Sequence, residues 1–440
     1  MKIGFVSLGC SKNLVDTEVM LKRLADAGYT ITPDETEADI IVVNTCGFIQ
    51  SAKEEAIDNI LDVAWLKKNR ALKGIIATGC LVERYREQVL EEMPEVDAVL
   101  GTGSYHKIVE AVEAVARGEK YASFEDKNAA PLGGERIVTT PPYTAYLKVA
   151  EGCDNRCTYC AIPLIRGRMR SRRMEDVVAE AKSLEKIGVK ELNIIAQDTS
   201  RYGLDLYGKY MLPELVQKIL TETQIPWIRL LYLYPDKITD ELVAVIRDND
   251  RVCKYVDLPI QHVNDTVLAR MNRHGDGAVV RAAVEKIRRE IPGVTLRTTA
   301  IVGFPGETEA QFAELCEFVK ETGFDRFGAF TYSPEEGTPA AEFPDQIDEQ
   351  VKQDRYDTLM AVQLEVSEKK MQEKIGDVIE VLCEGYDPVA GVQYGRSRAD
   401  APDVDGKVYF TSAKKLPEGV FVNVKITKAL DYVLFGEAVR

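Results

Sequence analysis

The 440-residue chain has only three histidines and no long uninterrupted run of apolar residues. Imidazole-based metal sites and histidine-dependent triads are therefore poor candidates for its chemistry. A membrane-spanning helix needs about 18 or more apolar residues in succession, so no membrane association is expected. The N-terminus has the pattern of a β-strand and lacks the basic, apolar and small-residue segments of a signal peptide. These absences predict a cytoplasmic protein.

Acidic residues outnumber basic ones, 71 to 56, which gives a formal net charge of −15. A chain with this charge as a whole does not attract phosphate backbones. Strong nucleic-acid binding is therefore not expected, and a basic protein is the better partner.

The strand and helix patterns predict an α/β protein of three parts joined by one linker. Residues 1–120 alternate β-branched runs with amphipathic stretches, which predicts a doubly wound parallel sheet. Residues 121–142 collect Pro, Gly and polar residues and are expected to form a linker. Residues 143–373 contain six strand–helix units, enough for a partial (βα)6 barrel. Residues 374–440 show short strands typical of a small antiparallel, OB-like β-barrel.

Three of the nine cysteines share one structural position, since Cys10, Cys46 and Cys80 each closely follow a predicted strand and lie next to a glycine. The carboxyl ends of parallel strands meet at one edge of a sheet, so the three thiols are expected to converge there. The adjacent glycines suggest that something bulky approaches the backbone. The alternative is that each cysteine is a small buried apolar residue.

A second set of cysteines follows the first strand of the expected (βα)6 barrel, as Cys153-xxx-Cys157-xx-Cys160. Three thiolates within eight residues can bind one face of a metal cluster, and they are one short of the four that close a structural zinc or iron–sulfur site. A zinc loop with a remote fourth ligand and a redox-active thiol group are the alternatives.

This spacing, with the aromatic Tyr159 before the last cysteine, resembles the radical S-adenosylmethionine superfamily. The resemblance implies a 4Fe-4S cluster held by the three cysteines, with an open iron that chelates S-adenosylmethionine. A low-potential cluster of this kind can transfer one electron to the sulfonium and produce a 5′-deoxyadenosyl radical.

Further candidates for binding S-adenosylmethionine lie at the carboxyl ends of predicted barrel strands, where chemistry in βα-barrels is found. Gln197 follows the second strand, and Gly303 and Gly306 follow the fifth. With Tyr159 they form the expected cofactor-binding set. The alternative for each of these strand-end residues is a role in a turn or helix cap.

The order of the three parts resembles the methylthiotransferases over essentially the whole chain, with the last part similar to their TRAM module. The resemblance implies that Cys10, Cys46 and Cys80 hold a second 4Fe-4S cluster, whose open iron carries the inserted sulfur. It also implies an electron donor and a sulfur co-substrate, either sulfide or polysulfide.

Within that family, three segments most resemble the branch that modifies the β-carbon of an aspartate in small-subunit ribosomal protein number twelve. They are Cys160–Arg172, Ile195–Gly203 and Leu258–His262. The expected enzyme is therefore a transferase that adds a methylthio group to a basic ribosomal protein. The alternatives are the same chemistry on a tRNA adenosine and a non-enzymatic iron–sulfur RNA-binding protein. The final module has nine basic and eleven acidic residues from Met371 onward, which disfavours dedicated RNA binding.

Five arginines follow the second cysteine set within eight residues: Arg166, Arg168, Arg170, Arg172 and Arg173. One interpretation is a solvated helix start with ion pairs. The other is that some of them neutralise an anionic cluster or hold a substrate carboxylate. The sequence does not choose among the five.

Overall fold

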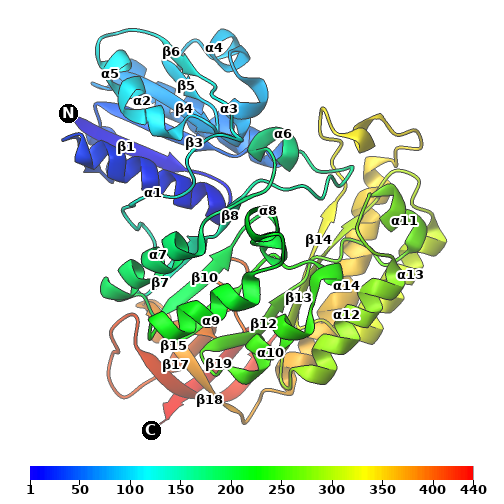
Figure 1. The fold of residues 1–440 in the computed structure, drawn as a ribbon. Coiled ribbons are helices and arrows are strands. Elements are labelled where there is room, and N and C mark those ends of the chain that lie inside the picture. The colour runs from blue at the N-terminus through cyan, green and yellow to red at the C-terminus, as the bar shows by residue number, and fades with distance from the viewer. Residues whose placement is uncertain (440) are drawn as a thin grey trace.

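The computed structural model describes residues 1–439. Figure 1 shows the N-terminal sheet and the C-terminal barrel at opposite ends of a central α/β part. Within the described residues, no helix has both the length and the apolar character needed to cross a membrane.

The N-terminal part is a six-stranded parallel sheet in the order β2-β1-β3-β4-β5-β6. Its strands are β1 (Lys2–Ser7), β2 (Thr30–Thr32), β3 (Ile40–Thr45), β4 (Gly74–Gly79), β5 (Ala98–Leu100) and β6 (Tyr121–Ser123). Helices α1 (Ser11–Asp26) and α5 (Ile108–Ala116) pack on one face, and α2 (Gln50–Asn69), α3 (Cys80–Tyr85) and α4 (Gln88–Glu92) pack on the other. The doubly wound sheet is therefore confirmed.

The segment expected to be a linker begins differently from the prediction. Residues 121–123 form β6, which pairs with β5 at the edge of the N-terminal sheet. A three-residue strand is too short to show a periodicity. The polar residues that follow β6 therefore led to the prediction of a linker that begins at residue 121.

The central part is an open, all-parallel sheet in the order β14-β13-β12-β11-β10-β7. Its strands are β7 (Thr144–Lys148), β10 (Glu191–Ile195), β11 (Trp227–Leu230), β12 (Val252–Asp257), β13 (Thr295–Val302) and β14 (Arg326–Thr331). One face packs against α7 (Met174–Lys186), α9 (Leu212–Glu222), α10 (Asp240–Asp248), α12 (Gly277–Glu290), α13 (Glu309–Thr322) and α14 (Glu349–Gln372). Six parallel strands with helices on one side form the expected partial barrel.

Shorter elements complete the central part around the second cysteine set. They are β8 (Ala150–Glu151), β9 (Arg170–Ser171), α6 (Ile162–Arg166), α8 (Leu204–Tyr207) and α11 (Asp265–Arg270). Strands β8 and β9 pair with each other and bracket the cysteine loop and α6.

The C-terminal part is a closed five-stranded barrel in the order β15-β16-β17-β19-β18. Its strands are β15 (Val378–Asp387), β16 (Val392–Ser397), β17 (Val408–Thr411), β18 (Phe421–Leu430) and β19 (Val433–Val439). The expectation of a purely antiparallel barrel is wrong at one pair, because β17 and β19 run parallel. Closure of the barrel brings the last strand beside the third in the same direction.

The barrel docks on the face of the central sheet that the helices leave uncovered. Alternation along β10 and β11 directs Glu191 and Arg229 to that face, and both are fully buried. The Glu191 carboxylate accepts bonds from Arg229 at 3.0 Å and from Arg396 of the barrel at 2.5 Å. Burial alone would raise the pKa of Glu191, but Arg396 and Arg229 lower it to about 2. The two ion pairs of Glu191 therefore contribute their full stabilisation above pH 4.5. That stabilisation is lost as pH falls toward about 2 and the carboxylate is protonated.

Replacement of Glu191 by alanine should destabilise the protein strongly, because it leaves two guanidinium groups buried without their shared partner. The expected loss is about 3–5 kcal/mol in the free energy of unfolding, measured by urea denaturation. The control is Glu222→Ala, which breaks the exposed pair with Lys182 and should cost less than about 1 kcal/mol. Equal losses in the two variants would contradict this account of the docking.

Candidate active site between the two parallel sheets

The three N-terminal cysteines lie together at the carboxyl edge of their sheet, as the sequence predicts. Cys10 follows β1 and precedes α1, Cys46 follows β3, and Cys80 is the first residue of α3 after β4. A Cβ added at Gly9 would lie 2.8 Å from the Cβ of Cys46. A Cβ added at Gly47 would lie 2.7 Å from the backbone nitrogen of Leu81, the residue after Cys80. The loops that carry the thiols are therefore stacked directly on one another.

These contacts change the explanation of the glycines. The sequence suggested that something bulky approaches their backbone, whereas the structure shows that the neighbouring cysteine loop fills the space beside Gly9 and Gly47. Side chains at these positions would separate the loops. The glycines therefore bring the thiols close together.

Exposure differs across the N-terminal set, from the exposed Cys10 to the buried Cys80. Burial raises the pKa of Cys80 to about 12, with Arg166 opposing the rise and Cys10 and Cys46 adding to it. The mutual influence of the thiols reflects their proximity. A bound cation could deprotonate such a set, and it would be approachable from the side of Cys10.

The second cysteine set forms a tight loop between β8 and α6. The amide of Cys153 donates to the carbonyl of Gly167 at 3.1 Å. The sulfur of Cys157 lies 3.1 Å from the hydroxyl of Tyr234, and the guanidinium of Arg273 lies 3.9 Å from the centre of that tyrosine ring. Arg273 also reaches within 4.0 Å of the same sulfur. Sequence reasoning missed Tyr234 and Arg273, because no spacing connects them to the cysteine loop.

The alternatives for the cysteines can be compared with their arrangement. All nine thiols are free. Across residues 1–439, no group of three or more His, Cys, Asp or Glu side chains is placed to hold a single metal ion. Each set offers three thiolates, which is one face of a 4Fe-4S cluster.

A cavity of about 960 Å³ opens between the two sheets, and we call it the central cavity. Residues 48–51, which come soon after Cys46, border it from the N-terminal part, and Tyr159 borders it from the second cysteine loop. Gln261 and Tyr332 line it from the strand ends of the central sheet. The Oε1 atom of Gln261 and the hydroxyl of Tyr332 are buried without a partner within the described protein, so both are free to bond a ligand.

A buried ion-pair group joins the two sides of the central cavity. Glu335, on the loop after β14, is bound by Arg84 at 2.7 Å and by Lys53 at 3.0 Å. Lys53 lies on α2 and Arg84 on α3, the helices that follow Cys46 and Cys80. The carboxyl edges of the two sheets therefore face each other and are held together beside the cavity.

The expected cofactor-binding residues have different surroundings. Tyr159 lines the central cavity, and Gln197 donates to Glu151 at 2.7 Å while its Oε1 is buried without a partner in the described protein. Gly303 and Gly306 have φ of +72° and +74°. A Cβ on either would meet a side chain at 2.3 Å or less, from Lys352 or Arg270. These two glycines therefore meet the packing needs of a turn, and their binding to S-adenosylmethionine stays a prediction.

The five arginines after the second cysteine set divide by their surroundings. Arg168 and Arg173 are exposed, and Arg173 pairs with Asp176 at 2.9 Å. The buried Arg172 pairs with Glu180 at 2.6 Å. Arg166 is buried and donates to the sulfur of Cys80 at 3.4 Å. Solvated ion pairs thus describe part of the group, and Arg166 is the member that contacts a cysteine.

Comparison with known proteins defines the class. Residues 147–319 match the Radical SAM superfamily, residues 375–439 match the TRAM domain, and residues 2–101 match Uncharacterized protein family UPF0004. The fold is similar to that of the radical S-adenosylmethionine methyltransferase TsrM from Kitasatospora setae, with a TM-score of 0.57 at 14% identity over 77% of this chain and 76% of that one. The cobalamin-dependent radical enzyme OxsB gives a TM-score of 0.51 at 12% identity, over 81% of this chain and 56% of that one. The chain is a radical S-adenosylmethionine protein.

Similarity in sequence is much higher to one family of that class. The chain is 50% identical to "Ribosomal protein uS12 methylthiotransferase RimO" of Desulforamulus reducens, over 99% of both chains. It is also 50% identical to the protein of the same name from Geobacter sulfurreducens, over 100% of this chain and 98% of that one. The chain belongs to the RimO family of methylthiotransferases.

Replacement of Gly47 by alanine should push the Cys46 loop away from Cys80, because the new Cβ would overlap the backbone of Leu81. We expect a loss of about 1–3 kcal/mol in the free energy of unfolding and faster labelling of the Cys80 thiol. The control is Gly328→Ala in β14, where an added Cβ meets no atom within 4 Å. Unchanged stability and labelling at Gly47 would show that the loops are not stacked.

Proposed function

We propose that the protein adds a methylthio group to the β-carbon of an aspartate in ribosomal protein uS12. The observation that carries the proposal is that the loops of two cysteine sets border the same cavity, through residues 48–51 after Cys46 and through Tyr159 next to Cys160. Full-length relatives at 50% identity bear the name of this activity. The β-carbon hydrogens of aspartate are too inert for acid–base chemistry, so a radical mechanism fits the target.

Cys153, Cys157 and Cys160 hold the 4Fe-4S cluster that membership of the radical class implies. When bound, that cluster supplies the electron that cleaves S-adenosylmethionine to methionine and a 5′-deoxyadenosyl radical. Arg273 places a positive charge beside the sulfur of Cys157. Tyr234 orients the same sulfur through its hydroxyl. Four residues bind S-adenosylmethionine: Tyr159, Gln197, Gly303 and Gly306.

Cys10, Cys46 and Cys80 would hold a second 4Fe-4S cluster, which would supply the sulfur to be inserted, drawn from sulfide or polysulfide. Supporting evidence is the stacking of their three loops and the mutual influence of their thiols. An external electron donor completes the system. The volume of the central cavity, about 960 Å³, is sufficient for a target side chain beside S-adenosylmethionine. The free hydroxyl of Tyr332 can donate a hydrogen bond to the target.

The net charge of the whole chain, −15, favours a basic protein segment. The two carboxylates that line the central cavity are already paired, Glu335 with Arg84 and Lys53 and Glu349 with Lys352, so the preference comes from the whole chain. An anionic tRNA would be repelled where a basic ribosomal protein is attracted. Strong binding of nucleic acid is therefore not part of the proposed function.

Mass spectrometry after anaerobic turnover tests the substrate. The reconstituted full-length protein would receive S-adenosylmethionine, a reductant and sulfide, with uS12 and bulk tRNA offered together. We expect an aspartate-containing peptide of uS12 to gain one SCH₃ group in place of hydrogen. The same gain on adenosine would move the activity to tRNA, and no gain on either substrate would refute methylthiolation.

Single cysteine variants separate the two proposed clusters. Cys157→Ala should abolish formation of 5′-deoxyadenosine, because the radical cluster loses a ligand. Cys80→Ala should still form 5′-deoxyadenosine but give no methylthio product, since only the sulfur-carrying cluster is affected. The matched control is Cys316→Ala, because that partly exposed thiol lies on α13, outside both cysteine sets. Normal 5′-deoxyadenosine formation by Cys157→Ala would exclude the proposed assignment of the radical cluster.

A further inference from the structure

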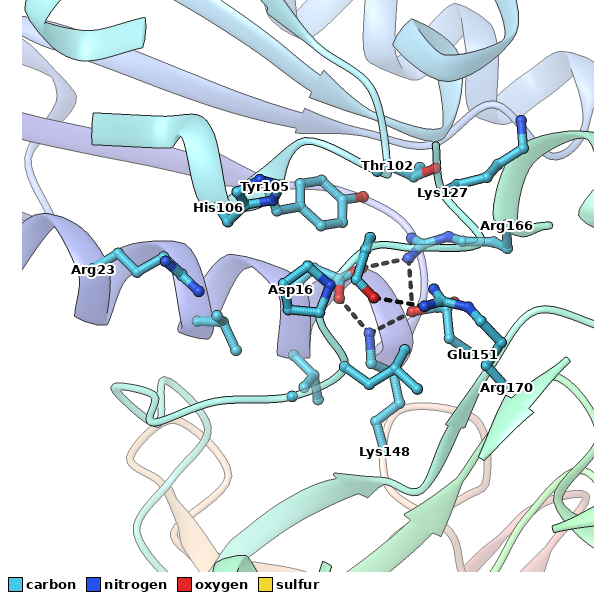
Figure 2. A pocket seen from close by; sticks show the side chains of 17 residues that line it. Asp16, Arg23, Thr102, Tyr105, His106, Lys127, Lys148, Glu151, Arg166 and Arg170 are labelled. Atoms are coloured by element: carbon cyan, nitrogen blue, oxygen red, sulfur yellow. Dashed lines mark hydrogen bonds and ion pairs between the residues drawn. The ribbon is translucent and has the colours of Figure 1, made fainter. Parts of the chain in front are cut away.

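Four charged side chains are buried together where α1 meets the central part, and we call them the buried charge cluster. They are Asp16, Lys148, Glu151 and Arg166, each at most 8% exposed. Figure 2 shows them pointing toward one another beneath Tyr105. Lys148 pairs with both carboxylates, and Arg166 binds Asp16 at 2.5 Å and lies 3.5 Å from Glu151. Two cations and two carboxylates thus balance each other in charge.

Arg166 contacts the N-terminal cysteine set directly, although it belongs to the central part of the chain. Its Nη2 donates to the sulfur of Cys80 at 3.4 Å and to Oδ1 of Asn13 at 3.0 Å. Asn13 in turn donates to the backbone carbonyls of Leu8 and Thr45 in two of the cysteine-bearing loops. One guanidinium therefore braces all three loops of the N-terminal set.

The same guanidinium is linked to the second cysteine set. It stands at the end of α6, the helix that directly follows Cys160, and Ala161 and Ile165 of this segment pack against Cys80. On the other side of the guanidinium lies Glu151, two residues before Cys153. The Glu151 carboxylate also accepts a hydrogen bond from Gln197. The buried charge cluster therefore connects Cys80, the segment before Cys153 and the expected S-adenosylmethionine site.

Charge decides what Arg166 does for a cluster at the N-terminal site. The buried charge cluster is neutral by itself, and a 4Fe-4S cluster with three thiolates would add negative charge beside it. Reduction by one electron makes that charge more negative. A guanidinium against a ligand sulfur in a buried site stabilises the reduced form more than the oxidised form and so raises the reduction potential.

We propose that Arg166 is a positioning residue that fixes the N-terminal cluster site against the radical site and raises the reduction potential of the N-terminal cluster. This inference rests on the proposed second cluster. It assigns to one arginine of five a role that the sequence left open. The remaining charged residues of the buried charge cluster hold Arg166 in place and contact no cysteine sulfur among the described residues.

A redox titration followed by electron paramagnetic resonance tests the inference without turnover. The parent is the full-length protein with Cys153, Cys157 and Cys160 all replaced by alanine, so that any signal comes from the N-terminal cluster. Arg166→Gln in this parent should shift the midpoint potential to a lower value and alter the spectrum. The matched control is Arg172→Gln, since Arg172 is also buried but pairs with Glu180.

Two further variants keep the test decisive if Arg166→Gln folds poorly. Arg166→Lys retains the charge but cannot bind Cys80, Asn13 and Asp16 at once, so it should give a smaller shift in the same direction. Asp16→Asn removes a nearby negative charge and should shift the potential upward. A potential and spectrum that match the parent in both Arg166 variants would overturn the inference. Absence of iron from the parent itself would instead refute the proposed second cluster and, with it, the basis of this inference.

Discussion

The arrangement of this protein depends on the buried pairing of Asp16 and Glu151 with Lys148 and Arg166. Each group is nearly inaccessible to water, where removal of one partner of a pair costs about 3–5 kcal/mol. Asp16 belongs to the N-terminal sheet domain, and the other three belong to the central part. The four charges can therefore all be satisfied only when the two domains meet in one relative orientation, and that orientation places the carboxyl edges of the two sheets opposite each other.

The facing edges explain how one chain brings the loops of two cysteine sets beside one cavity. Parallel strands deliver every strand end to a single edge, so residues far apart in sequence converge without any local motif. The Glu335 contacts with Lys53 and Arg84 fix the far side of the central cavity. The C-terminal barrel is docked through Glu191 on the face of the central sheet that the helices leave uncovered, at the opposite end of the molecule from the N-terminal sheet (Figure 1). The barrel thus stabilises the central sheet and does not border the cavity.

Periodicity and spacing predicted most of the architecture. The six central strands and the helices on both faces of the N-terminal sheet were predictable because buried parallel strands are long apolar runs. The short β6 and the parallel β17–β19 pair were not, since a three-residue strand carries no period and closure of a barrel is not local. Tyr234 and Arg273 were not predicted for a similar reason: their contact with Cys157 arises only when the segments that follow β11 and α11 pack beside the cysteine loop.

By itself the sequence determined the chemistry available to this protein, since the two sets of three cysteines are a property of residue type and spacing. It also determined that Cys10, Cys46 and Cys80 would meet at one edge, because strand direction follows from the strand–helix alternation. Only the tertiary structure decided which of five neighbouring arginines reaches a thiol. Burial and ion pairing depend on the packing of domains, and Arg166 became the partner of Cys80 because α6 lies against α3.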